Sequence, residues 1–92
     1  MKRVVCPCCG NYTFEVESEK DIIIDICEVC FWQYDLAAHS KPNVSIGPNK
    51  LSLNEARENY KQFGAKREKF ANDKFVRQPL AKELPENNES IN

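Results

Sequence analysis

Hydrophobic and polar residues alternate strictly over residues 12–17, where the sequence reads YTFEVE. The three apolar side chains share one face of an extended chain, which predicts a half-buried β-strand. The polar stretch 18–21 indicates a turn, and the β-branched run IIIDIC over residues 22–27 predicts a return strand. The segment 31–35, FWQYD, is expected to add a third strand. The pattern therefore favours a β-hairpin or a three-stranded sheet.

A helical period appears in the second half of the chain. Apolar residues recur at helical spacing over residues 53–63, which predicts one amphipathic α-helix. Ser52 and Glu55 form a capping-box pattern at its start, and Gly64 is a typical helix stop. We expect this helix to pack on the sheet, because two or three strands alone form a thin core.

The remaining segments carry weaker patterns. Residues 36–50 contain proline and glycine turn signals and are expected to form a loop. Residues 65–76 can form a second short helix or an extended arm. Residues 78–92 are polar and aperiodic, which predicts a flexible, disordered C-terminal tail. The expected fold is a small α+β domain in which a sheet region over 1–50 is covered by a helical or arm segment over 51–77.

The cysteines change this picture, because a small domain commonly needs a disulfide or a bound metal ion to stabilise its fold. The chain has 92 residues with 41% hydrophobic content, enough for only a modest core. Its two C-x₂-C pairs, with residues 10–26 between them, match the spacing of zinc sites, in which four thiolates bind one ion tetrahedrally. The sequence therefore predicts a zinc ribbon over residues 1–50, with one structural Zn²⁺ held by Cys6, Cys9, Cys27 and Cys30.

Several assignments around this site stay open from the sequence. Rubredoxin-like iron sites use the same ligands, so iron is the alternative metal. Cys8 lies within the first pair and is expected to be a spare thiol, with a redox or ligand-exchange role as the alternative. His39, the only histidine, is expected at the surface, because four thiolates already satisfy the ion. Phe31 follows the second pair where glycine is usual, which leaves the local turn geometry open.

Charge and hydropathy limit the classes of partner. The net charge is −1, with 13 basic and 14 acidic residues, which gives no general reason to expect nucleic acid. Residues 11–36 are mainly acidic, whereas residues 57–77 contain seven basic residues. The start MKRVVC lacks the apolar core of a signal peptide, and no apolar run is long enough to span a bilayer. We therefore expect a cytoplasmic protein, in a compartment where clustered cysteines favour metal over disulfides.

Three longer stretches carry a resemblance to a known family. CPCCG, CEVCFW and GPNKLSLNEARENYKQFGA follow one another over roughly residues 6–65. In this order they resemble the bacterial cysteine-rich CPCC family of small proteins. Acidic residues usually follow the tryptophan in that family, whereas only Asp35 is present here. The resemblance implies a zinc-bearing bacterial cytosolic protein and implies no particular activity.

The function expected from these features is a structural zinc module that acts as a monomer and mediates protein–protein interaction. A closed four-thiolate site has no open position for water, and the chain shows no catalytic constellation, so we expect no enzyme activity. The alternative is a ribbon that binds nucleic acid through the basic segment 57–77. The candidate interaction residues are Phe31, Trp32, Tyr34, Arg57 and Lys61. The three aromatic residues among them belong to the core instead if they are buried.

Overall fold

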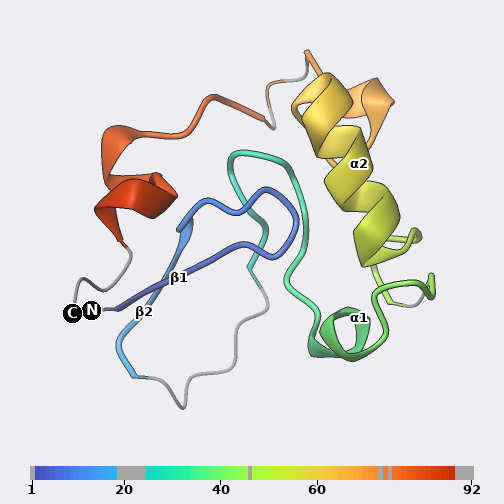
Figure 1. Ribbon diagram of the computed structural model, residues 1–92, viewed down its shortest axis with the longest axis horizontal. Helices are drawn as coiled ribbons and strands as arrows, with labels where there is room; N and C mark the ends of the chain where they lie inside the picture. Colours follow the sequence, from blue (N-terminus) through green and yellow to red (C-terminus); the bar gives the residue numbers. More distant parts are fainter. Residues whose placement is uncertain (1, 19–24, 46, 73, 75, 89–92) are drawn as a thin grey trace.

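The cysteine-bearing loops lie at the centre of a small α+β fold, with a two-stranded sheet on one side and the main helix on the other (Figure 1). This arrangement is taken from a computed structural model. It describes residues 2–18, 25–45, 47–72, 74 and 76–88.

The sheet consists of β1 (Lys2–Val4) and β2 (Phe14–Val16), which pair antiparallel. β2 lies within the predicted strand 12–17, and its Phe14 side chain faces the core with 3% of its surface exposed. The partner of β2 differs from the expectation. In the described residues its partner is β1, and residues 22–24 of the expected return strand lie outside these residues.

Each cysteine pair closes its own short hairpin, which accounts for this correction. After β1, the backbone N–H of Cys6 donates to the carbonyl of Asn11 at 2.8 Å, and the chain returns as β2. Around the second pair, Ile26 and Gln33 form an isolated antiparallel bridge. In place of one hairpin between the two pairs, the described residues show a chain reversal at each pair.

The third strand expected over 31–35 is not formed in the part of the chain that the structure describes. The backbone N–H and carbonyl of Gln33 point away from the bridge and bond to the side-chain amide of Asn49, both at 2.8 Å. An amide has the donor and the acceptor that a neighbouring strand would offer. The Asn49 side chain therefore stands in for a strand at this edge.

Helix α1 (Leu36–Ser40) occupies part of the segment predicted as loop. Asp35 caps it, since its carboxylate accepts a hydrogen bond from the backbone N–H of Ala37 at 3.0 Å. An aspartate cap favours a helix start. However, five residues are too few to show a helical period, so the sequence pattern does not reveal this turn.

Helix α2 (Leu53–Phe63) has the predicted bounds. The capping box is present, because the Ser52 hydroxyl accepts from the backbone N–H of Glu55 and the Glu55 carboxylate accepts from that of Ser52, both at 3.1 Å. Gly64 ends the helix with φ 77°, in the left-handed region. No helix in the described ranges is long and apolar enough to cross a membrane.

The core lies where α2 meets the cysteine loops. Trp32, Leu53 and Val29 are among the largest fully buried side chains, and they belong to one cluster with the buried cysteines. Leu53 comes from α2, whereas the other two come from the second cysteine loop. Burying each such side chain contributes about 1.5–3 kcal/mol. The helix therefore packs over the cysteine region.

The segment predicted as a flexible tail over 78–92 contains two short helical turns. Its Glu83 has only 5% of its surface exposed, and its carbonyl accepts from the backbone N–H of Tyr12 at 2.7 Å. Polar contacts thus hold this segment where a hydrophobic period is lacking. Residues 89–92 lie outside the described ranges. The 3₁₀ turns that follow α2 are η1 (Glu68–Phe70), η2 (Ala81–Glu83) and η3 (Pro85–Asn87).

Candidate metal centre

The first knuckle, the tight turn over residues 6–10, is shaped by backbone hydrogen bonds. Its reversal is closed by the bond from Cys6 to Asn11, and the N–H of Gly10 donates to the carbonyl of Cys6 at 2.8 Å. Gly10 has φ 80°, a conformation that glycine adopts without steric cost. The turn places Cys6 and Cys9 at the start and end of one tight loop.

The second knuckle, over residues 27–31, repeats this geometry. Cys27 donates to the carbonyl of Trp32 at 2.8 Å, and Phe31 donates to the carbonyl of Cys27 at 2.9 Å. Phe31 takes the position of Gly10 with φ 71°. The left-handed conformation costs a residue with a side chain about 1–2 kcal/mol. The two knuckles are therefore equivalent, although one ends in glycine and the other in phenylalanine.

Contacts of the Phe31 ring offset this strain. The ring of Phe70 meets it edge-on with centroids 4.7 Å apart, and the ammonium of Lys66 lies 5.0 Å from its centroid. Aromatic pairs and cation–π contacts each contribute about 0.5–1.5 kcal/mol beyond burial. The phenylalanine thus fastens the segment after α2 over the second knuckle.

The knuckles bring four sulfur atoms into one cluster. The sulfurs of Cys6 and Cys30 are 3.6 Å apart, those of Cys9 and Cys27 are 3.8 Å apart, and all four lie within 4.8 Å of one another. A tetrahedral ion with metal–sulfur bonds of ~2.3 Å holds its sulfurs roughly 3.8 Å apart. The cysteines are free thiols. Their spacing and chemistry therefore fit a metal ion.

The cluster is buried and is supported by hydrogen-bond donors. Cys6, Cys27 and Cys30 are fully buried. The hydroxyl of Thr13 lies 3.0 Å from the Cys27 sulfur, and the backbone N–H of Val29 lies 3.4 Å from it. Donors of this kind stabilise and orient a metal-bound thiolate.

Protonation of the cluster shows why a cation suits it. The contact with Cys30 lowers the pKa of Cys27, and the same contact raises the pKa of Cys30. Burial raises the pKa of Cys6. The thiols compete for protons, since each thiolate formed in this confined space disfavours the next. A divalent cation among them favours all four thiolates at once.

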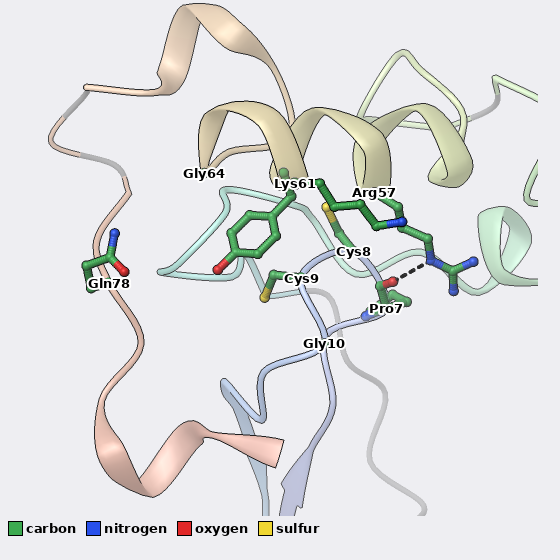
Figure 2. Close-up of a pocket in the computed structure, with 9 residues that line it drawn as sticks. Pro7, Cys8, Cys9, Gly10, Arg57, Lys61, Gly64 and Gln78 are labelled. Atoms are coloured by element: carbon green, nitrogen blue, oxygen red, sulfur yellow. Dashed lines mark hydrogen bonds between the residues drawn. The ribbon is translucent and has the colours of Figure 1, made fainter. Parts of the chain in front are cut away.

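Two other potential ligands lie outside the cluster. Cys8 has 6% of its surface exposed, and its sulfur points toward α2 whereas that of Cys9 points the other way (Figure 2). His39 packs edge-on against the ring of Tyr34, with centroids 5.1 Å apart, and burial lowers its pKa. The structure thus brings together the four predicted cysteines and leaves these two residues apart.

The five predicted interaction residues have different surroundings. Trp32 is fully buried and belongs to the core cluster, which is the alternative that the sequence left open for the aromatic candidates. Phe31 and Tyr34 are half-buried against other rings. Arg57 and Lys61 are exposed on α2. Only the last two lie open on the surface.

Sequence reasoning missed the polar residues that brace the second knuckle. Asn49 has 2% of its surface exposed, and its side-chain oxygen accepts from the ammonium of Lys66 at 2.9 Å. The backbone N–H of Lys66 donates to the carbonyl of Cys30 at 2.9 Å. No hydrophobic period marks these positions. The one available signal is the turn pair Gly47-Pro48 before the asparagine.

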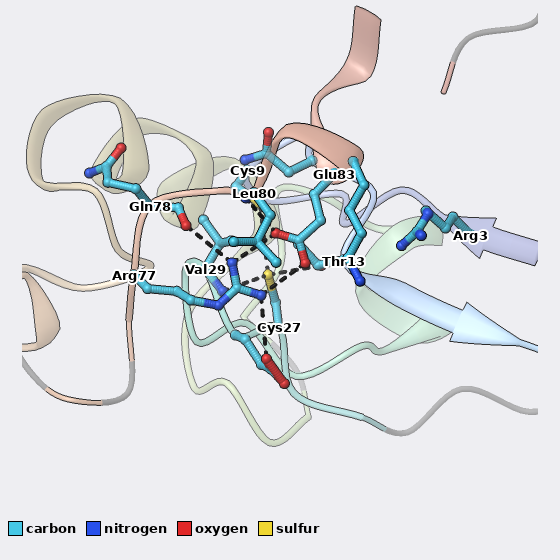
Figure 3. Close-up of polar contacts among 12 residues, drawn as sticks. Arg3, Cys9, Thr13, Cys27, Val29, Arg77, Gln78, Leu80 and Glu83 are labelled. Atoms are coloured by element: carbon cyan, nitrogen blue, oxygen red, sulfur yellow. Dashed lines mark hydrogen bonds and ion pairs between the residues drawn. The ribbon is translucent and has the colours of Figure 1, made fainter. Parts of the chain in front are cut away.

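Arg77 and Glu83 form a second brace, here called the clamp (Figure 3). Two guanidinium nitrogens of Arg77 meet the two carboxylate oxygens of Glu83, both at 2.8 Å, and the backbone N–H of Leu80 donates to one of them at 2.8 Å. Arg77 also contacts the carboxylate of Glu28, beside Cys27, at 3.3 Å. The hydrogen bonds from Arg77 lower the pKa of Glu83. The clamp therefore fastens the C-terminal segment beside the second knuckle.

The fold and the site define a small cysteine-rich α+β domain whose four-sulfur cluster can hold a metal ion. The chain belongs to the Cysteine-rich CPCC family, whose model matches residues 4–83. No curated protein and no solved structure matches the chain. The family match covers both knuckles and α2, and it reaches Glu83, so the clamp lies within it.

Proposed function

We propose that this protein is a structural zinc module that docks onto another protein. The observation that carries the metal assignment is the buried four-sulfur cluster, with sulfur separations of 3.6 and 3.8 Å. Zinc prefers four thiolates in a tetrahedral structural site and has no redox chemistry. A small domain has a limited hydrophobic core, and such an ion provides the additional folding stability that the core does not supply.

A structural role fits this site better than a catalytic one. Four protein sulfurs complete a tetrahedral shell and leave no position at which the ion can bind water or substrate. Zinc binding to sites of this kind provides on the order of 10 kcal/mol or more toward folding. That is comparable to the whole stability of an ordinary domain, about 5–15 kcal/mol. The ion therefore serves to fix the knuckles.

A hollow beside the second knuckle supports docking to a protein. It encloses about 570 Å³, and its lining residues are Ile26, Cys27, Glu28, Phe31, Lys74 and Arg77. Ile26 has 47% of its surface exposed. Apolar and aromatic side chains surrounded by charged residues are typical of a protein interface with a polar rim. This surface favours a protein partner that covers Ile26.

The alternative of nucleic-acid binding has weaker support, because several bases of segment 57–77 are engaged within the domain. Lys66 bonds to Asn49, and the Arg67 guanidinium donates to the backbone carbonyl of Lys50 at 2.7 Å. Arg77 is committed to the clamp. Nucleic-acid affinity arises mainly from several simultaneous phosphate contacts. Among the described residues of this segment, these three bases are engaged within the domain and are less available for such contacts.

The metal assignment is tested by metal analysis and thiol counting on the full chain. We expect one zinc per chain, with the four cluster thiols protected from alkylation and only Cys8 open to slow reaction. After treatment with a chelator, all five cysteines should react and the chain should unfold. One iron per chain, or a well-folded protein without metal, would contradict the proposal.

The docking proposal is tested by cross-linking in the native host cell. A photoreactive residue at position 26 should capture one protein, whereas the same residue at the exposed position of Lys41 should not. Capture should be lost in the Cys9→Ser variant, in which the knuckles cannot form. Equal capture from both positions would refute docking through the hollow.

A further inference from the structure

Figure 2 shows a second concave surface, a groove between the first knuckle and α2. It shares no lining residue with the hollow at Ile26. It encloses about 580 Å³. Pro7 and Cys8 border it on the knuckle side, and Arg57 and Lys61 border it on the helix side. None of its lining residues is acidic.

Arg57 is held in place at the wall of this groove. Its Nε donates to the carbonyl of Pro7 at 2.8 Å, and its Nη1 donates to the side-chain oxygen of Asn54 at 3.2 Å. Within the described residues no acceptor takes the hydrogens of its Nη2. A guanidinium fixed in this way can bind a ligand with little loss of side-chain freedom.

Lys61 and Tyr60 add two further donors. The ammonium of Lys61 contacts Glu58 at 3.2 Å, but both side chains are more than 60% exposed, and such a surface pair contributes little. Lys61 can therefore exchange this partner for a ligand. The hydroxyl of Tyr60 accepts from the side-chain amide of Asn11 at 3.4 Å, which leaves its proton for an acceptor in the groove.

The lining of the groove is uncrowded at Gly10. A Cβ atom built on Gly10 would meet no atom within 4 Å. The second knuckle has Phe31 at the equivalent position, where Phe70 and Lys66 cover it. The first knuckle therefore carries no ring at this position, whereas the ring of the second knuckle packs against its neighbours.

We propose that this groove binds an acidic peptide segment of the partner protein, whose carboxylates meet Arg57 and Lys61. This inference rests on the proposed docking function and adds a contact site and a partner chemistry to it. Two cations and a hydroxyl suit one or two carboxylates, with bidentate geometry at the guanidinium. A nucleic acid would need a longer basic track.

The test measures binding of a fluorescein-labelled hexaglutamate peptide to the zinc-loaded full chain by fluorescence anisotropy. The double variant Arg57→Glu/Lys61→Glu should weaken binding at least about tenfold, the effect of losing about 1.4 kcal/mol. The matched control Lys41→Glu/Lys82→Glu reverses two exposed charges outside the groove. Both variants change the net charge from −1 to −5, since each reversal subtracts two. The control should bind within about threefold of the unmodified chain.

Four outcomes would overturn the groove assignment. They are equal weakening by both double variants, no binding of hexaglutamate at millimolar concentration, tighter binding of a hexathymidine oligonucleotide, and loss of zinc from the groove variant. The cross-link from position 26 separates this result from the docking proposal. If the groove variant still captures the same protein while its hexaglutamate binding is unchanged, docking stands and the groove assignment fails.

Discussion

Removal of Arg77 should leave a buried carboxylate without its main partner. The side chain of Glu83 is 6% exposed, and it receives two hydrogen bonds from Arg77 and one from the backbone of Leu80. The substitution Arg77→Ala deletes the first two and retains the third. We therefore expect the zinc-loaded domain to be destabilised.

The expected loss follows from the burial of the two partners. A hydrogen bond to a charged group contributes about 1.5–3 kcal/mol, and breaking a fully buried ion pair costs about 3–5 kcal/mol. The Arg77 side chain is 32% exposed, so water can enter the space that it leaves and partly hydrate Glu83. The lower end of these ranges applies, and we expect a loss of about 2 kcal/mol.

Urea unfolding followed by the fluorescence of Trp32 measures this loss. Zinc must be held at the same excess throughout, because metal binding adds to the apparent stability. With a slope of about 1 kcal/mol per molar urea for a domain of this size, the midpoint should fall by roughly 2 M. Lys82→Ala, an exposed neighbour in the same turn, serves as control and should change stability by less than about 0.5 kcal/mol.

A double variant distinguishes an unpaired carboxylate from a general loss of packing. Arg77→Ala/Glu83→Ala removes both charges, so it should cost no more than Arg77→Ala alone. The reasoning is refuted if Arg77→Ala costs less than 0.5 kcal/mol, or if the double variant costs the sum of the two single ones.

The remaining predictions concern the cluster and the supports of the second knuckle. Cys9→Ser should leave the chain unfolded by circular dichroism, because metal binding contributes on the order of 10 kcal/mol to folding. Cys8→Ser should keep the fold and one metal ion, and metal loss from this variant alone would refute the ligand assignment. Gly47→Ala sets a Cβ against the Asp35 carboxylate and gives alanine a φ of 81°, so it should cost about 2–3 kcal/mol in urea unfolding, and a cost below 1 kcal/mol would contradict the close approach. Asn49→Ala should cost about 2–4 kcal/mol in the same assay, because it removes two hydrogen bonds to the half-buried backbone of Gln33 and one to the ammonium of Lys66, and a neutral effect would show that water replaces the amide.

Local features of the sequence were sufficient for some elements. The capping box and Gly64 mark the two ends of an eleven-residue segment whose apolar residues recur at helical spacing. Helix α2 has the bounds that these signals predict. The cysteine spacing identified the four residues whose sulfurs meet in the cluster. Both kinds of signal are encoded within a few residues of the feature that they predict, so one sequence suffices to find them.

Such local signals do not predict which strands pair with each other. β1 has only three residues, too few to show an alternation of apolar and polar side chains. The sequence of β2 does not indicate which segment it pairs with. The partner is set by the first knuckle, which reverses the chain so that Val4 lies opposite Phe14. A C-x₂-C pair is therefore both a ligand pair and a hairpin turn, and its flanks are the segments that pair.

The C-terminal segment shows why composition misleads in a domain of this kind. Residues 78–88 have little to bury in a hydrophobic core, and their polar composition suggests disorder. Their order comes instead from one arginine and one glutamate six positions apart, which close a short loop against the second knuckle. Such a pair has no period and cannot be distinguished in sequence from solvated surface charges.

The difference between the two knuckles links the fold to the proposed recognition surface. Equivalent backbone turns end in Gly10 and in Phe31, both with positive φ. Because Phe31 has a ring, Lys66 and Phe70 pack against it at the second knuckle. Gly10 has no side chain to cover the first knuckle, so a groove remains there beside α2. A nearly symmetric four-sulfur frame is therefore flanked by two different concave surfaces, and the residue after each cysteine pair, glycine or phenylalanine, is part of the lining of each.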